Sequence, residues 1–187
     1  MPYKVFTEEE LEHLVPYTWR RRGNAVDRTR WNPPRVKGAC QQHGIPVKDS
    51  EVVSLVFEDA TSDWEQLVHL ESDVETLVDA RPYKRGVLIP YDLRHAKHRV
   101  ACRTSEGKLW VWNVWQYRGP QGELRLESCE NFAGMLVEEL PNGYRYRCNE
   151  GRDDDDYDDL IFRIERTGVV EPPRRKRGSR RQTPSKR

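Results

Sequence analysis

Three groups of residues have the types and the spacing to carry chemistry. Cys40 with His43, and His95-x-x-His98-x-x-x-Cys102, are thiols and imidazoles at spacings that zinc ligands can adopt. A run of six aspartates within residues 150–159 offers the oxygen ligands that calcium prefers. Arginines and lysines gathered near both ends of the chain can pair with phosphate. The sequence therefore raises zinc, calcium and nucleic acid as ligands.

Both metal hypotheses have simpler alternatives. His95 and His98 lie on a basic loop that enters a strand, where imidazoles more often face solvent or phosphate. The aspartate run lacks the alternating ligands, central glycine and closing glutamate of an EF-hand. We therefore predict no metal site and no cofactor. The loop 150–159 is interpreted as solvated, with metal binding and pairing to a basic segment as its alternatives.

Charge is strongly segregated although the net charge is only +1. Residues 20–37 hold seven Lys or Arg and one Asp, and residues 171–187 hold eight Lys or Arg and one Glu. The rest of the chain is acidic, with a net charge of −12. Clustered cations attract phosphate through their local field. The predicted nucleic-acid-binding residues are Arg20, Arg21, Arg22, Arg28, Arg30, Trp31, Arg35, Arg174, Arg175, Lys176, Arg177, Arg180 and Arg181.

The two basic segments differ in composition. The C-terminal one has no apolar residue with which to fold, so we expect a disordered polycation that binds DNA or RNA without reading sequence. A nuclear import address and a solubilising tail are its alternatives. The N-terminal arm also carries Trp19 and Trp31, which can stack on bases or anchor the arm to the domain.

Composition sets the class of protein. An apolar fraction of 36% and a mean hydropathy of −0.93 allow one modest core, which we place in residues 51–170. Residues 1–50 are interpreted as an N-terminal helix and basic arm, and residues 171–187 as a tail. No apolar run approaches the length of a membrane span, and four scattered cysteines are typical of a reduced compartment. We expect an intracellular protein, which is cytoplasmic or, if the host is eukaryotic or viral, nuclear.

Local patterns predict the elements of the core. A capping box from Thr7 to Glu10 opens a helix with Leu11, Leu14 and Val15 on one face. Apolar residues at helical spacing predict further helices over residues 64–79 and 130–140. Strands are predicted at residues 52–58, 86–91, 123–126, 144–148 and 160–165.

Residues 97–115 are predicted to form a β-hairpin around a Ser-Glu-Gly-Lys turn. Its second strand places Trp110 and Trp112 on one face and Asn113 and Trp115 on the other. We expect Trp110 and Trp112 in the core and Trp115 at the strand end, beside an open cleft.

On this pattern the chain resembles the restriction-endonuclease-like PD-(D/E)XK superfamily, and within it the TnsA-like endonuclease subunit of transposases. Glu75 stands for the helix glutamate, Arg99 falls where that family has Asp, and Asn113 and Trp115 fall where it has Glu-x-Lys. The resemblance implies an α/β or α+β fold, with a mixed central sheet and flanking helices. It also implies lost catalysis, because arginine, a neutral amide and an indole cannot together hold Mg²⁺.

These observations predict a catalytically inactive, nuclease-like accessory protein that binds DNA or RNA in a mobile-element or phage context. The alternative is a viral or phage interaction factor that docks on a host protein through Trp110, Trp112 and Trp115. A third hypothesis, an enzyme, uses Glu75, Asp92, His95 and His98 as a displaced metal site.

Overall fold

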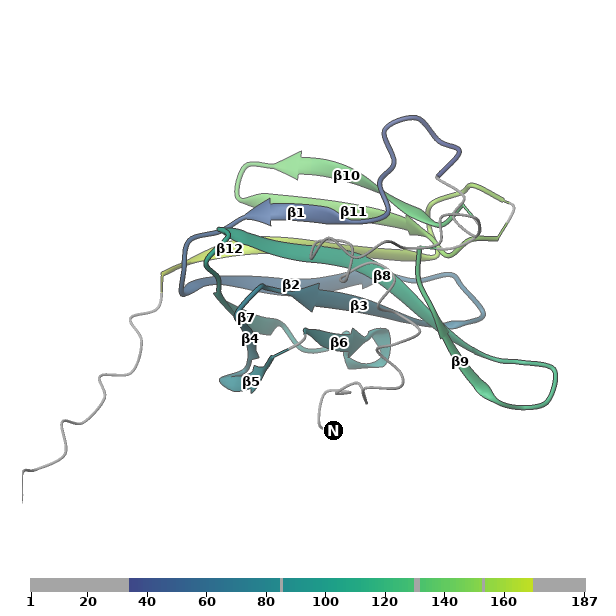
Figure 1. The fold of residues 1–187 in the computed structure, drawn as a ribbon. Helices are drawn as coiled ribbons and strands as arrows, with labels where there is room; N and C mark the ends of the chain where they lie inside the picture. Colours follow the sequence, from purple (N-terminus) through teal and green to yellow (C-terminus); the bar gives the residue numbers. More distant parts are fainter. Residues whose placement is uncertain (1–33, 85, 130–131, 153, 170–187) are drawn as a thin grey trace, which may run out of the picture.

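Two antiparallel β-sheets form the fold in the computed structural model, which describes residues 34–84, 86–129, 132–152 and 154–169 (Figure 1). The five-stranded sheet has the order β1 (His43–Pro46), β8 (Lys108–Arg118), β3 (Glu65–Glu71) and β6 (Val87–Pro90), with β9 (Leu124–Glu127) paired to the end of β8. The seven-stranded sheet has the order β10 (Gly134–Leu140), β11 (Gly143–Asn149), β12 (Leu160–Val169), β2 (Glu51–Asp59), β7 (His98–Arg103), β4 (Glu75–Val78) and β5 (Arg81–Tyr83). One 3-10 turn, η2 (Tyr91–Leu93), follows β6.

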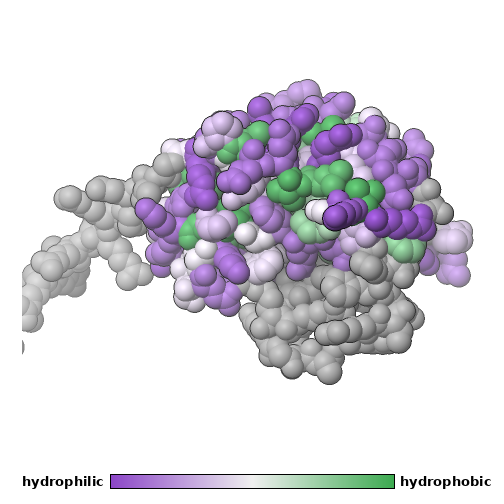
Figure 2. Space-filling model, turned by 90° about the horizontal axis from the view of Figure 1, so that it is seen from above, coloured by the Kyte–Doolittle hydropathy of each residue, from purple (hydrophilic) through white to green (hydrophobic). Residues whose placement is uncertain are grey.

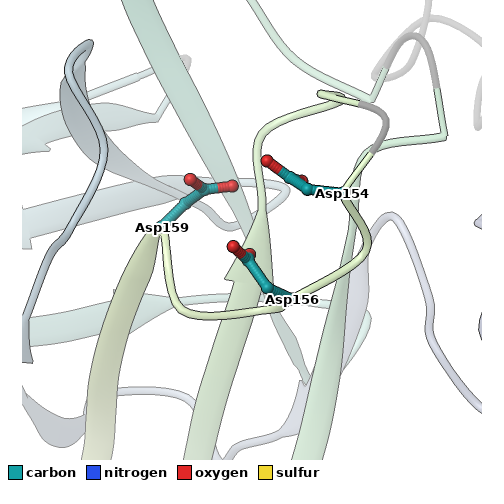
Figure 3. A group of neighbouring side chains, drawn as sticks. All are labelled: Asp154, Asp156 and Asp159. Carbon is teal, nitrogen blue, oxygen red and sulfur yellow. The ribbon is translucent and has the colours of Figure 1, made fainter.

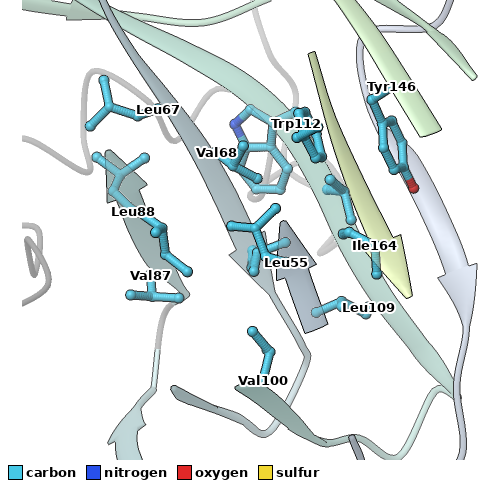
Figure 4. Packing of buried hydrophobic residues seen from close by; sticks show 14 of the residues in the cluster. Leu55, Leu67, Val68, Val87, Leu88, Val100, Leu109, Trp112, Tyr146 and Ile164 are labelled. Atoms are coloured by element: carbon cyan, nitrogen blue, oxygen red, sulfur yellow. The ribbon is translucent and has the colours of Figure 1, made fainter. Parts of the chain in front are cut away.

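The sheets pack face to face as a sandwich. Polar contacts identify the inward face of the five-stranded sheet: Asn113 Nδ2 donates to the Asn149 carbonyl at 3.2 Å, and His43 Nδ1 lies 2.9 Å from the Tyr146 hydroxyl. Apolar side chains of both sheets pack into one buried cluster (Figure 4). The inward residues of the seven-stranded sheet include Val53, Leu55, Phe57, Val100, Cys102, Tyr146, Cys148, Leu160, Phe162 and Ile164.

Charged residues cover the outer face of the seven-stranded sheet. Arg145 and Arg163 both pair with Glu58, at 2.7 and 3.0 Å, and Lys97 pairs with Glu165 at 2.7 Å. The guanidinium groups stay more than a third exposed, so each pair contributes little to stability. Hydrophilic side chains also predominate in the view from above, where hydrophobic ones form small patches (Figure 2). The outer face of this sheet is therefore largely charged, although Val52 and Ser54 of β2 are buried on it.

The predicted α/β or α+β fold with flanking helices is wrong, because the described chain is nearly all antiparallel strand. Residues 64–79 form β3 and β4 instead of a helix, and β10 replaces the helix predicted over residues 130–140. In β3 every residue from Gln66 to Leu70 is buried, so the alternation that marks a half-buried strand is lost. The apolar spacing then imitates a helix.

The predicted hairpin is also wrong, although both of its strands exist. β7 pairs with β2 and β4, whereas β8 pairs with β1, β3 and β9 in the other sheet. Residues 104–107 therefore cross between the sheets. Asp73 fixes this crossing by accepting hydrogen bonds from the Thr104 hydroxyl and from the Ser105 backbone N–H, the latter at 3.0 Å.

The other strands agree with the sequence. β2, β6, β9, β11 and β12 lie where strands are predicted. β1, which precedes residue 51, pairs with β8 inside the five-stranded sheet. The helix predicted from Thr7 lies outside the described residues. Trp115 is 1% exposed, so the expectation of an open cleft beside it is wrong.

Substitutions on β8 test this packing. Trp112→Ala and Trp115→Ala should each lower the free energy of unfolding by about 3–5 kcal/mol, because both rings are 1% exposed and their removal leaves a cavity. Leu124→Ala is the control, since Leu124 is 55% exposed. Urea unfolding would measure all three. Losses for both tryptophan variants as small as that of the control would contradict the burial of these two rings.

Candidate functional site

The four positions of the degenerate nuclease site do not come together. Glu75 and Arg99 lie on β4 and β7, on the outer face of the seven-stranded sheet, where Glu75 stands opposite Arg103. Asn113 and Trp115 are buried on the inward face of β8 in the other sheet. The two pairs belong to different sheets and face different surroundings, so they form no common site.

Three residues of the zinc hypotheses, His43, His98 and Cys102, are engaged in the fold. His43 contacts the Tyr146 hydroxyl, and His98 Nε2 lies 3.1 Å from the Leu93 carbonyl. Cys102 is fully buried, and burial raises the pKa of its thiol to about 12. A thiol with so high a pKa stays protonated at neutral pH, which disfavours metal binding.

An acidic cluster forms at the loop between β11 and β12 (Figure 3). Asp154, Asp156 and Asp159 each bring a carboxylate oxygen within 4.8 Å of the others. Among the described residues no other group of three His, Cys, Asp or Glu side chains meets in this way. Asp154 and Asp156 are exposed and Asp159 is buried. Exposed acidic groups are common without an ion, so the cluster alone does not establish a cation site.

Beside this cluster lies a buried glutamate. The Glu150 carboxylate accepts hydrogen bonds from the Ser62 hydroxyl and the Gln66 side-chain amide, and its other oxygen lies 3.1 Å from Arg152 Nε. The backbone N–H of Glu150 donates to the Asp159 carboxylate at 2.7 Å. Arg152 in turn covers the Trp64 ring at 4.5 Å. A single arginine thus partners a carboxylate with no solvent exposure.

The pKa values of the Glu150 and Asp159 carboxyls are both raised toward neutral pH. Burial, reinforced by the nearby Asp159 charge, raises the pKa of Glu150 to about 7, against the opposing effect of the Ser62 hydrogen bond. Burial also raises the pKa of Asp159 to about 6, and the charges of Asp156, Asp154 and Asp158 add to the effect. Both carboxyls can therefore exchange protons between about pH 5 and 8.

Sequence reasoning assigned the loop to solvent and missed Glu150 and Asp159 as buried groups. A usable signal was present: these residues are the first and last acidic positions of a loop that joins two predicted strands. If those strands pair as neighbours, the loop ends must lie side by side. The contact between the Glu150 N–H and Asp159 is the result.

One predicted nucleic-acid residue lies within the described chain. Arg35 stacks over the Phe132 ring at 3.8 Å, and its guanidinium is 3.9 Å from an Asp155 oxygen. The side chain is 41% exposed. The basic arm therefore joins the sandwich next to the acidic loop. The other predicted residues, Arg20, Arg21, Arg22, Arg28, Arg30, Trp31, Arg174, Arg175, Lys176, Arg177, Arg180 and Arg181, lie outside the described residues.

Comparisons with known proteins found no matching family model, no matching curated protein and no matching solved structure. The nuclease resemblance therefore has no support beyond the residues that suggested it. In the part of the chain that the structure describes, no helix is long and apolar enough to cross a membrane.

Replacing Glu150 by Gln should flatten the dependence of stability on pH. A carboxyl whose pKa is raised by folding contributes stability that is present below pH 4.5 and lost as the pH rises through about 7. Between pH 4.5 and 8 the wild-type free energy of unfolding should therefore fall by about 1–3 kcal/mol more than that of Glu150→Gln. The new amide can donate to Gln66 Oε1, which has no hydrogen-bond partner.

Chemical unfolding at several pH values would measure this difference. Asp92→Asn, at an exposed position of η2, serves as the control and should retain the wild-type profile. Parallel curves for the wild type and Glu150→Gln would show that this carboxyl does not titrate differently in the folded chain.

Proposed function

We propose that this protein binds DNA or RNA through the phosphate backbone, using the basic segments 20–37 and 171–187. The observation that carries the proposal is the charge contrast along the chain: +6 and +7 on these segments, against sixteen Lys or Arg and twenty-five Asp or Glu over residues 38–170. Flexible cationic segments bind nucleic acid by displacing counterions from phosphate. Such binding needs no enzymatic site and reads little sequence.

The organisation of the sandwich supports the arms as the contact region. Several arginines of the body are already paired with its own carboxylates. Arg103 lies 3.5 Å from Asp49, and Arg166 pairs with Glu51. An acidic body also repels phosphate, so contacts are expected at the cationic ends. The nuclease-like and mobile-element parts of the earlier hypothesis lose their basis with the α/β fold.

Docking on a host protein through the tryptophans is less well supported. Trp112 and Trp115 are each 1% exposed, and Trp110 is only partly accessible. Side chains that dominate protein interfaces must present their surface to the partner. These rings stabilise the fold instead, so we do not assign them a docking role.

Fluorescence anisotropy with a labelled duplex and a labelled single strand would test the proposal. Replacing Arg174, Arg175, Lys176 and Arg177 by serine should weaken binding to unrelated sequences alike. It should also reduce the slope of log K against log salt by several units, since each phosphate contact on duplex DNA contributes about −0.9. Arg145→Gln is the matched control, because Arg145 pairs with Glu58 on the sheet.

The control should leave both the affinity and the salt slope unchanged. A lack of binding by the wild-type protein to either probe at 50 mM salt would refute the proposal. Equal losses in the tail variant and in Arg145→Gln would place the contacts on the body.

A further inference from the structure

One segment of the body departs from its acidic charge. Residues 81–103 hold seven Lys or Arg and one Asp, whereas the rest of residues 38–170 holds nine Lys or Arg and twenty-four Asp or Glu. The segment includes β5, which is the edge strand of the seven-stranded sheet, and β7, which is separated from β5 only by β4 (Figure 1). The cations of β5 and β7 therefore lie near one edge of this sheet.

Four cations of this segment are exposed and form no ion pair with any carboxylate of the described residues. They lie on β5, directly after β5, after η2 and on β7, and are Arg81, Lys84, Arg94 and Arg99. We call these four residues the β5–β7 surface. Two further cations of the segment are paired, since Lys97 lies 2.7 Å from Glu165 and Arg103 lies 3.5 Å from Asp49.

The carboxylates beside the β5–β7 surface leave its charge uncompensated. Asp79 accepts a hydrogen bond from the backbone N–H of Arg99 at 3.3 Å, and Glu75 stands opposite Arg103 on the next strand. Asp92, the one acidic residue of the segment, is exposed on η2. None of these three carboxylates forms an ion pair with a cation of the surface, within the part of the chain that the structure describes.

Strand register places the β5–β7 surface close to the end of β12, after which the basic tail follows in the chain. One row of paired residues crosses the sheet from β12 to β5, and consists of Val169, Glu51, Cys102, Thr76 and Tyr83. Along this row β12 and β7 are two strands apart, or about 10 Å. Arg99 lies three residues from the row along β7, again about 10 Å. A nucleic acid bound by residues 171–187 therefore comes near this surface.

We propose that the β5–β7 surface binds the phosphate backbone of the same nucleic acid, as a contact on the folded body. This inference rests on the proposed function. Three of the four cations are arginines, whose planar guanidinium groups can hold phosphate oxygens with two parallel hydrogen bonds. Phosphate contacts of this kind fix the position and orientation of a protein on nucleic acid without reading its sequence.

Two double variants of the full chain test this surface by fluorescence anisotropy with the labelled duplex and single strand. Arg81→Gln with Arg99→Gln removes two cations of the surface and should weaken binding to unrelated sequences alike. It should also reduce the slope of log K against log salt on duplex DNA by about 2, because each phosphate contact contributes about −0.9. Arg118→Gln with Arg147→Gln removes the same charge from exposed positions on β8 and β11, and should leave the slope close to the wild-type value.

Both double variants should retain the wild-type Tm, since all four side chains are exposed. Should Arg99→Gln lower Tm, Lys84→Gln with Arg94→Gln makes the same change of charge on the surface.

The possible outcomes separate this inference from the proposed function. A wild-type slope in the surface variant together with a reduced slope in the tail variant would overturn this inference alone, as would equal losses in the two double variants. A lack of binding by the wild-type protein would overturn the proposed function as well. Labelled poly-glutamate that binds the wild type as tightly as DNA, and loses affinity in the surface variant, would identify an acidic protein as the partner and would also overturn it.

Discussion

The constraint on which the fold depends is that the five-stranded sheet is buried on both faces. β8 shows this directly, because Val111 and Trp112 are successive residues with opposite directions and neither is more than 1% exposed. One face is covered by the seven-stranded sheet. A chain with an apolar fraction of 36% thus concentrates its core around two central strands, β3 and β8.

Residue type, more than burial, determined which elements the sequence could reveal. β2 was predictable because its short run is rich in Val and Phe, which favour strands, although Glu51–Leu55 are all buried. β3 was not, since its central residues are all buried and their apolar run has no period of two. The helical spacing found from Trp64 onward came from two short strands joined by a turn at Ser72–Val74. The local sequence pattern therefore predicted a helix where β3 and β4 lie, although β3 is a central strand of its sheet.

The pairing of strands was likewise beyond local pattern. A Ser-Glu-Gly-Lys turn between apolar runs favours a hairpin, yet residues 104–107 pass between sheets and Asp73 fixes the crossing. The candidate site shows the same limit. The aspartate run was visible, whereas the burial of Glu150 follows from the pairing of β11 with β12 and from Ser62 and Gln66 on a distant part of the chain. The nuclease resemblance matched residues in order along the chain and failed because they lie in different sheets.

Charge is distributed unevenly between the sandwich and the two basic segments. An acidic sandwich has its basic arm joined beside the acidic loop, where Arg35 meets Asp155, and its basic tail after β12. Arginines of the body such as Arg103, Arg145 and Arg166 pair with its carboxylates, so we expect the proposed phosphate contacts on the arms and on the β5–β7 surface. Glu150 and Asp159 add a pair of carboxyls that titrate near neutral pH at the same end of the sandwich.

The central claim is that β3 and β8 are buried on both faces and form the centre of the core. Amide hydrogen exchange measured by NMR on the full chain tests it most directly. We predict the slowest exchange for the backbone amides of residues 66–70 and 111–115, and much faster exchange for those of β9. Exchange in β3 and β8 as fast as in β9 would contradict the account.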